Sequence, residues 1–240
     1  MRAGGSAMAQ IFHPSMNTVA KATIFGAVFV AAALGYIGWQ VDRSPYITNQ
    51  GIVKDQPVPF SHEHHVSGLG IDCRYCHTSV ETSGFAGIPS TKICMTCHSQ
   101  IWTNAEILEP IRASWRNNEP IRWTRVHDLP DFVQFNHSIH VAKGIGCYEC
   151  HGEVDKMPLM WKENSLHMQW CLECHRDPAK HIRDRSEVFV MRPRTVPEGK
   201  DPHEYGLELM EKYHVRTRID QPPGHEKPPN PLTNCSTCHY

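Results

Sequence analysis

Ten cysteines and five histidines form five copies of one short pattern, Cys-x-x-Cys-His, which together use every cysteine of the chain. Two thiols at this spacing bond covalently to the edge of a porphyrin while the adjacent imidazole binds its iron, so the pattern is the attachment signature of c-type haem. It predicts five covalent haem c groups, with the histidine of each motif as the proximal iron ligand. In chain order, motifs 1 to 5 are Cys73/Cys76/His77, Cys94/Cys97/His98, Cys147/Cys150/His151, Cys171/Cys174/His175 and Cys235/Cys238/His239.

Other uses of paired cysteines explain the pattern less well. Zinc ribbons also contain Cys-x-x-Cys pairs, but zinc coordination does not require a histidine directly after each second cysteine. A thioredoxin-like redox motif would occur once rather than five times. Histidine makes up 17 of the 240 residues, so chance would place it after all five pairs on the order of once in a million sequences. No cysteine remains for a disulfide or an iron–sulfur cluster.

A second histidine pattern, F-x-H-x-x-H-V, precedes motif 1 and motif 3. It reads FSHEHHV from Phe60 and FNHSIHV from Phe135. Histidines three residues apart project from one face of a helix, so the two imidazoles of a pair can reach two different irons. Because the whole frame repeats beside a haem motif, we expect all four histidines to be distal ligands: His62, His65, His137 and His140.

The remaining distal ligand is less constrained by the sequence. His127, just ahead of the second F-x-H-x-x-H frame, is the first choice, and Met168, three residues before Cys171, is the second. The difference matters because methionine in place of histidine raises the reduction potential of a haem. Further candidates stay open, especially for the last haem: His167, Met191, His203, Met210, His214 and His225.

These ligands must be positioned by a duplicated chain. The repeated frame, each time followed by two haem motifs, indicates two di-haem modules, residues 60–115 and 135–190, joined by a connector over 116–134. The arm from 191 to 240 carries motif 5. Eight of the 18 prolines lie between residues 193 and 231, which excludes long helices and central strands there. One short helix is expected in the arm, over 203–214, with Leu207, Met210 and His214 on one face.

The length of the chain narrows the expected fold class. About 40 residues per haem are too few to surround each cofactor with an ordinary apolar core. We therefore expect a mostly irregular chain with short α-helices at the haem motifs, in which the haems form much of the core.

The overall charge is nearly balanced, because the 24 basic and 25 acidic residues give a net charge of −1. This balance argues against a nucleic-acid partner.

The N-terminal region predicts the location of the protein. Residues 22–41 contain no charge, and as a helix of about 30 Å they can cross the hydrocarbon core of a membrane. Arg2 and Lys21 precede this span, so residues 1–21 are expected in the cytoplasm and the linker 42–59 and all haems in the periplasm. Such a single-pass anchor in the bacterial inner membrane agrees with haem c attachment outside the cytoplasm. A cleaved signal peptide, with a shorter apolar region, is the alternative.

The sequence also resembles a known family over nearly its whole length past residue 7. The similar family is the pentahaem cytochrome c subunit of bacterial alternative complex III, and the resemblance favours Met8 over Met1 as the start. The F-x-H-x-x-H frame with its Cys-x-x-Cys-His motif is also similar to class III multihaem cytochromes in general. The blocks that carry the resemblance are MAQIFHPSMNTVAK, FSHEHHVSGLGIDCRYCH, IPSTKICMTCHSQIW, RVHDLPDFVQFNHSIHV and MPLMWKENSLHMQWCLECH.

The resemblance implies a periplasmic electron-transfer subunit rather than an enzyme. Its expected partners are an integral-membrane quinol-oxidising subunit, an iron–sulfur subunit, and a monohaem cytochrome c or terminal oxidase. The family mixes bis-histidine and histidine/methionine haems, which keeps Met168 as a possible ligand. If two protein groups occupy every iron, no position is open to a substrate. The haem order in space, the potentials and the physiological acceptor are not contained in the sequence.

Two other functions remain open at the level of sequence. A self-sufficient quinol dehydrogenase of the NapC/NrfH kind also combines a short anchor with four or five haems, and Lys54 in the linker is a weak candidate for its quinol site. A periplasmic haem enzyme would require one iron with an open position. The Cys-x-x-Cys-Lys variant that marks a nitrite-reductase-like site does not occur.

Overall fold

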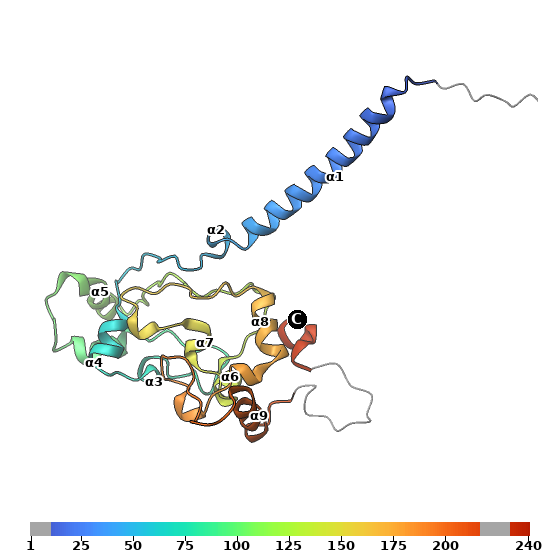
Figure 1. Ribbon diagram of the computed structural model, residues 1–240. Helices are drawn as coiled ribbons and strands as arrows, with labels where there is room; N and C mark the ends of the chain where they lie inside the picture. Colours follow the sequence, from blue (N-terminus) through green and yellow to red (C-terminus); the bar gives the residue numbers. More distant parts are fainter. Residues whose placement is uncertain (1–10, 217–230) are drawn as a thin grey trace, which may run out of the picture. The chain divides into compact units, whose positions relative to one another are not determined.

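The computed structural model describes residues 11–216 and 231–240 (Figure 1). The chain divides after Thr48 into two compact units, Met1–Thr48 and Asn49–Tyr240, which are described separately. Some features discussed from the sequence lie outside the described residues. These are the choice between Met1 and Met8, the candidate ligand His225, and Pro222, Pro223, Pro228 and Pro229 in the arm.

The first unit consists of helix α1 (Ser15–Asp42) and the single turn α2 (Pro45–Thr48). Helix α1 contains 28 residues, which corresponds to about 42 Å. It includes the whole predicted span 22–41 and begins seven residues earlier. No side chain of α1 is buried within the unit. The hydroxyl of Thr23 donates to the carbonyl oxygens of Val19 and Ala20, both at 3.0 Å. This polar group of the apolar helix therefore has hydrogen-bond partners within α1. An apolar N-terminal helix of this kind serves either as a membrane anchor or as an export signal.

The second unit is built from short helices and irregular chain. Within the described ranges, β-structure is limited to isolated bridges such as Gln50–Lys162 and Val133–His239. This confirms the expected fold class of a mostly irregular chain with short helices. The helical segments are η1 (Glu63–Gly68, a π-helix), α3 (Cys73–Cys76), α4 (Thr91–His98), η2 (Glu106–Leu108), α5 (Glu109–Asn117), α6 (His137–Ala142), α7 (Cys147–His151), η3 (Val154–Lys156), α8 (Met168–Arg176), η4 (Pro178–Lys180), η5 (Arg185–Glu187), α9 (Pro202–Lys212), η7 (Pro231–Thr233) and α10 (Cys235–Cys238).

Local sequence explains where several of these helices begin. The carboxylate of Asp72 accepts a hydrogen bond of 2.8 Å from the backbone of Arg74 and starts α3. Asn136 caps α6 in the same way through the backbone N–H of Ile139, at 3.3 Å. Such side-chain acceptors satisfy backbone donors that have no partner inside a first helical turn. As a result, motif 1 and the second histidine pair each lie on a capped turn.

The apolar core of the polypeptide itself is small and divided. One buried cluster lies where α9 meets η4 and contains Ala179, Ile182, Leu209, Met210 and Tyr213. Another lies around α5 and contains Val58, Leu108 and Ile111, with Cys94 and Met95 of α4 packed against it. Neither cluster contains a proximal histidine.

Helix α9 ends earlier than the helix predicted from the sequence. The predicted short helix over 203–214 exists, but it ends at Lys212 because His214 takes a left-handed conformation with φ of 53°. Met210 is buried as expected, whereas His214 lies beyond the helix and is exposed, so its expected place on the same face was wrong.

Gly206 allows α9 to approach η4 closely. A Cβ atom at this position would lie 1.8 Å from the carbonyl oxygen of Ala179 and 2.6 Å from its carbonyl carbon. Both are backbone atoms, so the conflict cannot be relieved by rotating a side chain. The absence of a side chain at residue 206 is therefore a condition for the close packing of α9 on η4.

We predict that Gly206→Ala destabilises the protein, although replacing glycine by alanine in a helix ordinarily stabilises it by about 1 kcal/mol. Forcing α9 away from η4 should instead cost about 1–3 kcal/mol, as overpacking does. Thermal unfolding of the haem-loaded protein in detergent measures the change, with Glu208→Ala on the exposed face of α9 as the matched control. A variant as stable as the wild type would contradict the packing described for Gly206.

Candidate haem-binding sites

Each Cys-x-x-Cys-His motif lies on a short helical turn of the second unit. Motif 1 occupies α3, motif 3 occupies α7 and motif 5 occupies α10, whereas motifs 2 and 4 form the C-terminal parts of the longer helices α4 and α8. On a helical turn, cysteines three residues apart share one face. All ten cysteines lie in the described ranges and all are free thiols. The structure therefore presents five cysteine pairs in the arrangement that thioether attachment to a porphyrin edge requires.

The two F-x-H-x-x-H frames have nearly the same geometry. Phe60 meets the ring of His62 edge-on (4.9 Å between centroids, 88°) and stacks on that of His65 (4.4 Å, 25°). Phe135 meets His137 edge-on (4.8 Å, 89°) and stacks on His140 (4.6 Å, 26°). The phenylalanine thus fixes both imidazoles of its pair in two different orientations. This agreement extends the duplication seen in the sequence to the side chains.

Three of these imidazoles face the proximal histidine of a haem motif at one common separation. The ring centroids lie 6.3 Å apart for His65 and His98, 6.5 Å for His137 and His151, and 6.2 Å for His140 and His175. An imidazole nitrogen binds a metal at about 2 Å, and the ring centre lies about 1 Å further, so two imidazoles on opposite sides of one iron have centroids about 6 Å apart. The three separations fit this arrangement.

Within the described residues, the fourth expected distal ligand, His62, faces no proximal histidine as closely as the other three. Burial, followed by the nearby imidazole of His77, lowers the pKa of His62 to about 4. The Nδ1 atom of His62 is buried without a hydrogen-bond partner. In the repeat, by contrast, Nδ1 of His137 bonds to the carbonyl oxygen of Gly84 at 2.9 Å. The first frame therefore leaves one imidazole less restrained than its counterpart in the second.

Hydrogen bonds at Nδ1 orient most of the histidine rings. Nδ1 of His65 bonds to the carbonyl oxygen of Ser61 (2.7 Å), and Nδ1 of His140 bonds to that of Asn136 (2.6 Å), both four residues earlier. Such a bond fixes the ring and leaves Nε2 with its lone pair, which is the usual support for a metal-binding histidine. Proximal histidines have the same support: His77 from Gly87 (2.7 Å), His98 from Ile101 (3.2 Å), His175 from Leu232 (2.8 Å) and His239 from Phe132 (3.3 Å).

The buried histidines are also held in the form that binds iron. Burial is the largest cause that lowers the pKa of His65 and His140, against the opposing effect of their backbone hydrogen bonds. Burial also lowers the pKa of His151 to about 3, with further contributions from His127 and His137. Since only the neutral imidazole has a free lone pair for a metal, these rings are ready to bind at neutral pH.

The cysteine surroundings favour an uncharged sulfur. Burial raises the pKa of Cys147, Cys150 and Cys174 to about 12. A thiolate, which is the form that binds zinc, is therefore disfavoured at these sites. A thioether, which forms when the S–H bond adds across a vinyl group of the porphyrin, carries no charge. An uncharged thioether therefore suits the buried positions of motifs 3 and 4.

The two candidates for the remaining distal ligand occupy different places. His127 lies against the proximal histidine of motif 3, with 4.3 Å between the ring centroids and an angle of 65°. Burial lowers the pKa of His127 to about 4, and its Nε2 atom is buried without a hydrogen-bond partner. Met168 is the first residue of α8 and is exposed. Helix α8 packs against η7, the turn that leads into motif 5.

Arg183 is a residue of the site that sequence reasoning missed. Its side chain is 1% exposed and its Nη2 lies 2.9 Å from a carboxylate oxygen of Glu149, between the two cysteines of motif 3. Burial would raise the pKa of Glu149, but hydrogen bonds from His181 and Arg183 hold it below its usual value. Gly146 makes room, because a Cβ atom there would lie 2.4 Å from Nε of Arg183. A buried ion pair beside motif 3 has no sequence signal apart from this glycine.

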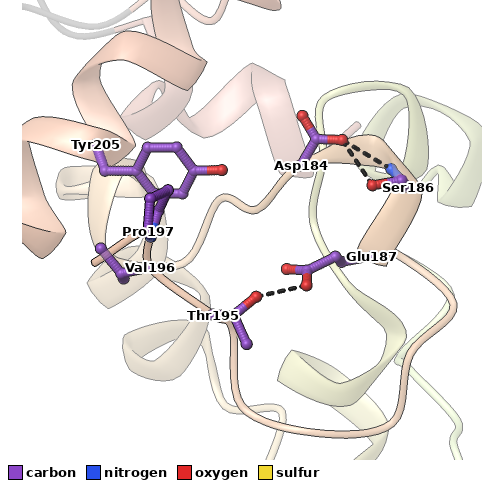
Figure 2. Close-up of a pocket in the computed structure, with 7 residues that line it drawn as sticks. All are labelled: Asp184, Ser186, Glu187, Thr195, Val196, Pro197 and Tyr205. Atoms are coloured by element: carbon purple, nitrogen blue, oxygen red, sulfur yellow. Dashed lines mark hydrogen bonds between the residues drawn. The ribbon is translucent and has the colours of Figure 1, made fainter. Parts of the chain in front are cut away.

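A separate pocket of about 280 Å³ contains no part of the haem-binding residues. Figure 2 shows that its polar groups bond to one another, since Asp184 accepts from Ser186 and Glu187 accepts from the hydroxyl of Thr195. None of the lining residues belongs to a haem motif or to the predicted ligands. The lining consists of Asp184, Ser186, Glu187, Thr195, Val196, Pro197 and Tyr205.

Comparison with known proteins agrees with this chemistry. The chain is 33% identical over 127 residues to the multiheme cytochrome c subunit of menaquinone reductase from Nitratidesulfovibrio vulgaris, a match that covers 52% of this chain and 54% of the relative. It is 25% identical over 114 residues to the acrylate reductase cytochrome subunit of Shewanella woodyi, covering 47% and 70%. The chain thus spans about half the length of the first relative. No protein-family model matches it.

The chain has the features of a multihaem c-type cytochrome. Its five motifs, their free thiols and the facing histidines supply what several covalent haems need, and both relatives are cytochrome subunits. The assignment of each histidine to one iron, and the number of haems attached, remain predictions.

We predict that His65→Ala and His140→Ala each convert one haem to the high-spin form while every haem stays covalently attached. The reason is that each substitution removes one of two axial nitrogens and leaves the cysteines intact. Absorption and EPR spectra of the oxidised protein measure the spin state. His64→Ala, an exposed neighbour in the first frame, is the matched control and should remain low-spin.

His137 is less suitable for this test, because the ring of His127 lies 4.3 Å from that of His151 and could replace His137 at the same iron. Unchanged low-spin spectra in both variants would show that His65 and His140 are not ligands.

Proposed function

We propose that all five motifs carry haem c and that the chain conducts electrons as the multihaem cytochrome subunit of a quinone-linked respiratory complex. The observation that carries the proposal is the facing of His65, His137 and His140 with proximal histidines at 6.2–6.5 Å. Iron with two histidine ligands has no open position for a substrate and changes only its charge, by one electron. The polypeptide supplies ligands, burial and orientation, which set the potential of each haem.

The proposed location is the periplasmic side of a bacterial inner membrane. Helix α1 is taken as a retained single-pass anchor, because 20 of its 28 residues form the charge-free span 22–41 and cover the hydrocarbon thickness. Arg2 and Lys21 precede the span, which places the N-terminus in the cytoplasm by the positive-inside rule. The haem domain is then held near the membrane surface, within reach of integral-membrane partners.

The proposed complex is of the alternative complex III kind. In it, a quinol gives up two electrons and two protons at an integral-membrane partner subunit, an iron–sulfur subunit lies alongside, and electrons leave one at a time to a monohaem cytochrome c or a terminal oxidase. The resemblance over nearly the whole chain past residue 7 favours this assembly. The similarity to the cytochrome subunit of a menaquinone reductase favours a second candidate, in which electrons flow through the same haems towards a quinone.

For the fifth haem we propose Met168 as the distal ligand. Helix α8, which begins at Met168, packs against η7 immediately before motif 5, whereas His127 lies against motif 3. A methionine ligand would raise the potential of this haem above that of a bis-histidine haem. His127 then remains a buried neighbour of the motif 3 pair.

A self-sufficient quinol dehydrogenase is the main alternative. The linker residue proposed for quinol binding, Lys54, donates a hydrogen bond of 3.2 Å to the carbonyl oxygen of Arg125. This interaction gives Lys54 a structural role within the haem domain. A haem enzyme would need an iron with one open position, and the facing histidine pairs at motifs 2, 3 and 4 leave motifs 1 and 5 as the places to look for it.

We predict that the purified chain, oxidised in detergent, is not reduced by a menaquinol or ubiquinol analogue until the native membrane partners are added. Haem absorbance follows the reduction, and the intact mass, which should include five haems, is measured on the same sample. Dithionite serves as the control, since it should reduce every haem without a partner. Prompt reduction of the isolated chain by quinol would contradict the proposal and support the self-sufficient dehydrogenase.

A further inference from the structure

We infer that the five motifs lie in the spatial order 2–1–3–4–5, so that motifs 2 and 5 are the two ends of the haem series. The inference rests on the proposed function, because it assumes a haem at every motif. It differs from the order along the chain only at motifs 1 and 2, and that difference decides which haem joins the two modules.

Motifs 1 and 2 are direct neighbours. Tyr75, between the cysteines of motif 1, places its hydroxyl 2.9 Å from the hydroxyl of Thr96, between the cysteines of motif 2. The first histidine frame gives the same result. His65 faces His98 of motif 2, and its carbonyl oxygen accepts a hydrogen bond of 3.1 Å from the backbone of Ile71, two residues before motif 1.

Motif 1, rather than motif 2, adjoins the second module. The guanidinium of Arg74, inside motif 1, lies 4.5 Å from the ring centroid of Phe189. The residue before it, Val188, accepts a hydrogen bond of 3.0 Å from the backbone of Cys147 in motif 3. The distal ligand of motif 3, His137, is bonded through both its backbone N–H (3.1 Å) and its Nδ1 (2.9 Å) to the carbonyl oxygen of Gly84, in the loop after motif 1.

Motifs 3 and 4 repeat the arrangement of motifs 1 and 2. His137 faces His151 of motif 3 and His140 faces His175 of motif 4, so α6 supplies ligands to both. The side-chain amide of Asn164, four residues before α8, donates to the carbonyl oxygens of Glu149 and Cys150 in motif 3, both at 3.1 Å. The chain is thereby held against motif 3 just before it forms motif 4.

Motif 5 adjoins motif 4. Nδ1 of His175 bonds to the carbonyl oxygen of Leu232 at 2.8 Å, in the turn η7 that precedes α10. In the view of Figure 1, the labels α4, α3, α7 and α8 and the C-terminal end follow one another across the second unit. These elements carry motifs 2, 1, 3, 4 and 5 in that sequence.

The order gives each motif a distinct place in electron transfer. Each step moves one electron from a ferrous haem to a ferric neighbour, with no bond made or broken. Motif 1 joins the two modules, so every electron that passes between the ends must cross it. A donor and an acceptor on separate partner subunits would meet this chain near motif 2 and near motif 5.

Removing single haems tests the order. Cys73→Ala with Cys76→Ala removes the haem of motif 1, and Cys94→Ala with Cys97→Ala removes that of motif 2. In partly reduced samples of the full chain in detergent, NMR exchange between haem methyl signals shows which haems still share electrons rapidly. With the order 2–1–3–4–5, loss of motif 1 isolates one haem from the other three, whereas loss of motif 2 leaves four haems in rapid exchange.

The opposite result, with four haems still in exchange after loss of motif 1 and one isolated after loss of motif 2, would overturn the inference and restore the order of the sequence. The intact mass of the wild type separately tests the proposed function. Fewer than five attached haems would refute the proposal that every motif carries haem c, and would not affect the contacts between motifs. If the motif 1 variant does not fold, a cryo-EM map of the native complex shows the order of the haems directly. A motif 2 haem between those of motifs 1 and 3 would overturn the inference.

Discussion

The structure depends on the need to place two imidazoles on opposite sides of one iron. A Cys-x-x-Cys-His motif supplies only the proximal ligand, so the distal one must come from another part of the chain. In the proposed ligand set, one helical turn supplies two distal ligands at once, and a phenylalanine before it contacts both rings. Each histidine pair therefore ties together two motifs that are otherwise separated along the chain. With such pairs as the fixed points, irregular loops can connect them without a sheet, and the described residues form only isolated β-bridges.

Burial and hydrogen bonding make this arrangement chemically consistent. Burial lowers the pKa of His62 and His151 and so keeps the imidazoles neutral, while it raises the pKa of Cys147 and Cys150 and so favours an uncharged sulfur. Carbonyl oxygens behind the rings fix which nitrogen is available. The main buried charge near the motifs is Arg183, which is paired with Glu149. Breaking such a pair by removing one partner typically costs about 3–5 kcal/mol, so Arg183 also holds motif 3 in place.

Much of the candidate site's local geometry could be predicted from the sequence, because it depends on residues close together along the chain. The motif histidines, the cysteine pairs and the F-x-H-x-x-H frames are short patterns in which spacing alone determines what a helical turn can present. The irregular fold also followed from the ratio of chain length to haem motifs and from the prolines of the arm. Arg183, the contact of Gly206 with Ala179 and the position of His127 beside His151 could not be predicted, since each joins segments that are far apart in sequence. The end of α9 was misplaced because His214 adopts a left-handed backbone that histidine seldom takes.

The most direct test of the ligand pairs is the EPR spectrum of the fully oxidised protein. The imidazole planes are nearly parallel for His137 with His151 (14°) and His140 with His175 (23°), but steeply tilted for His65 with His98 (65°). Parallel planes give a rhombic low-spin ferric signal, and tilted planes give one with a single very large g value. Both kinds of signal are expected in one spectrum, with the large-g signal coming from the haem of motif 2. A spectrum without the large-g signal, or with high-spin iron at three or more of the haems, would contradict these ligand pairs.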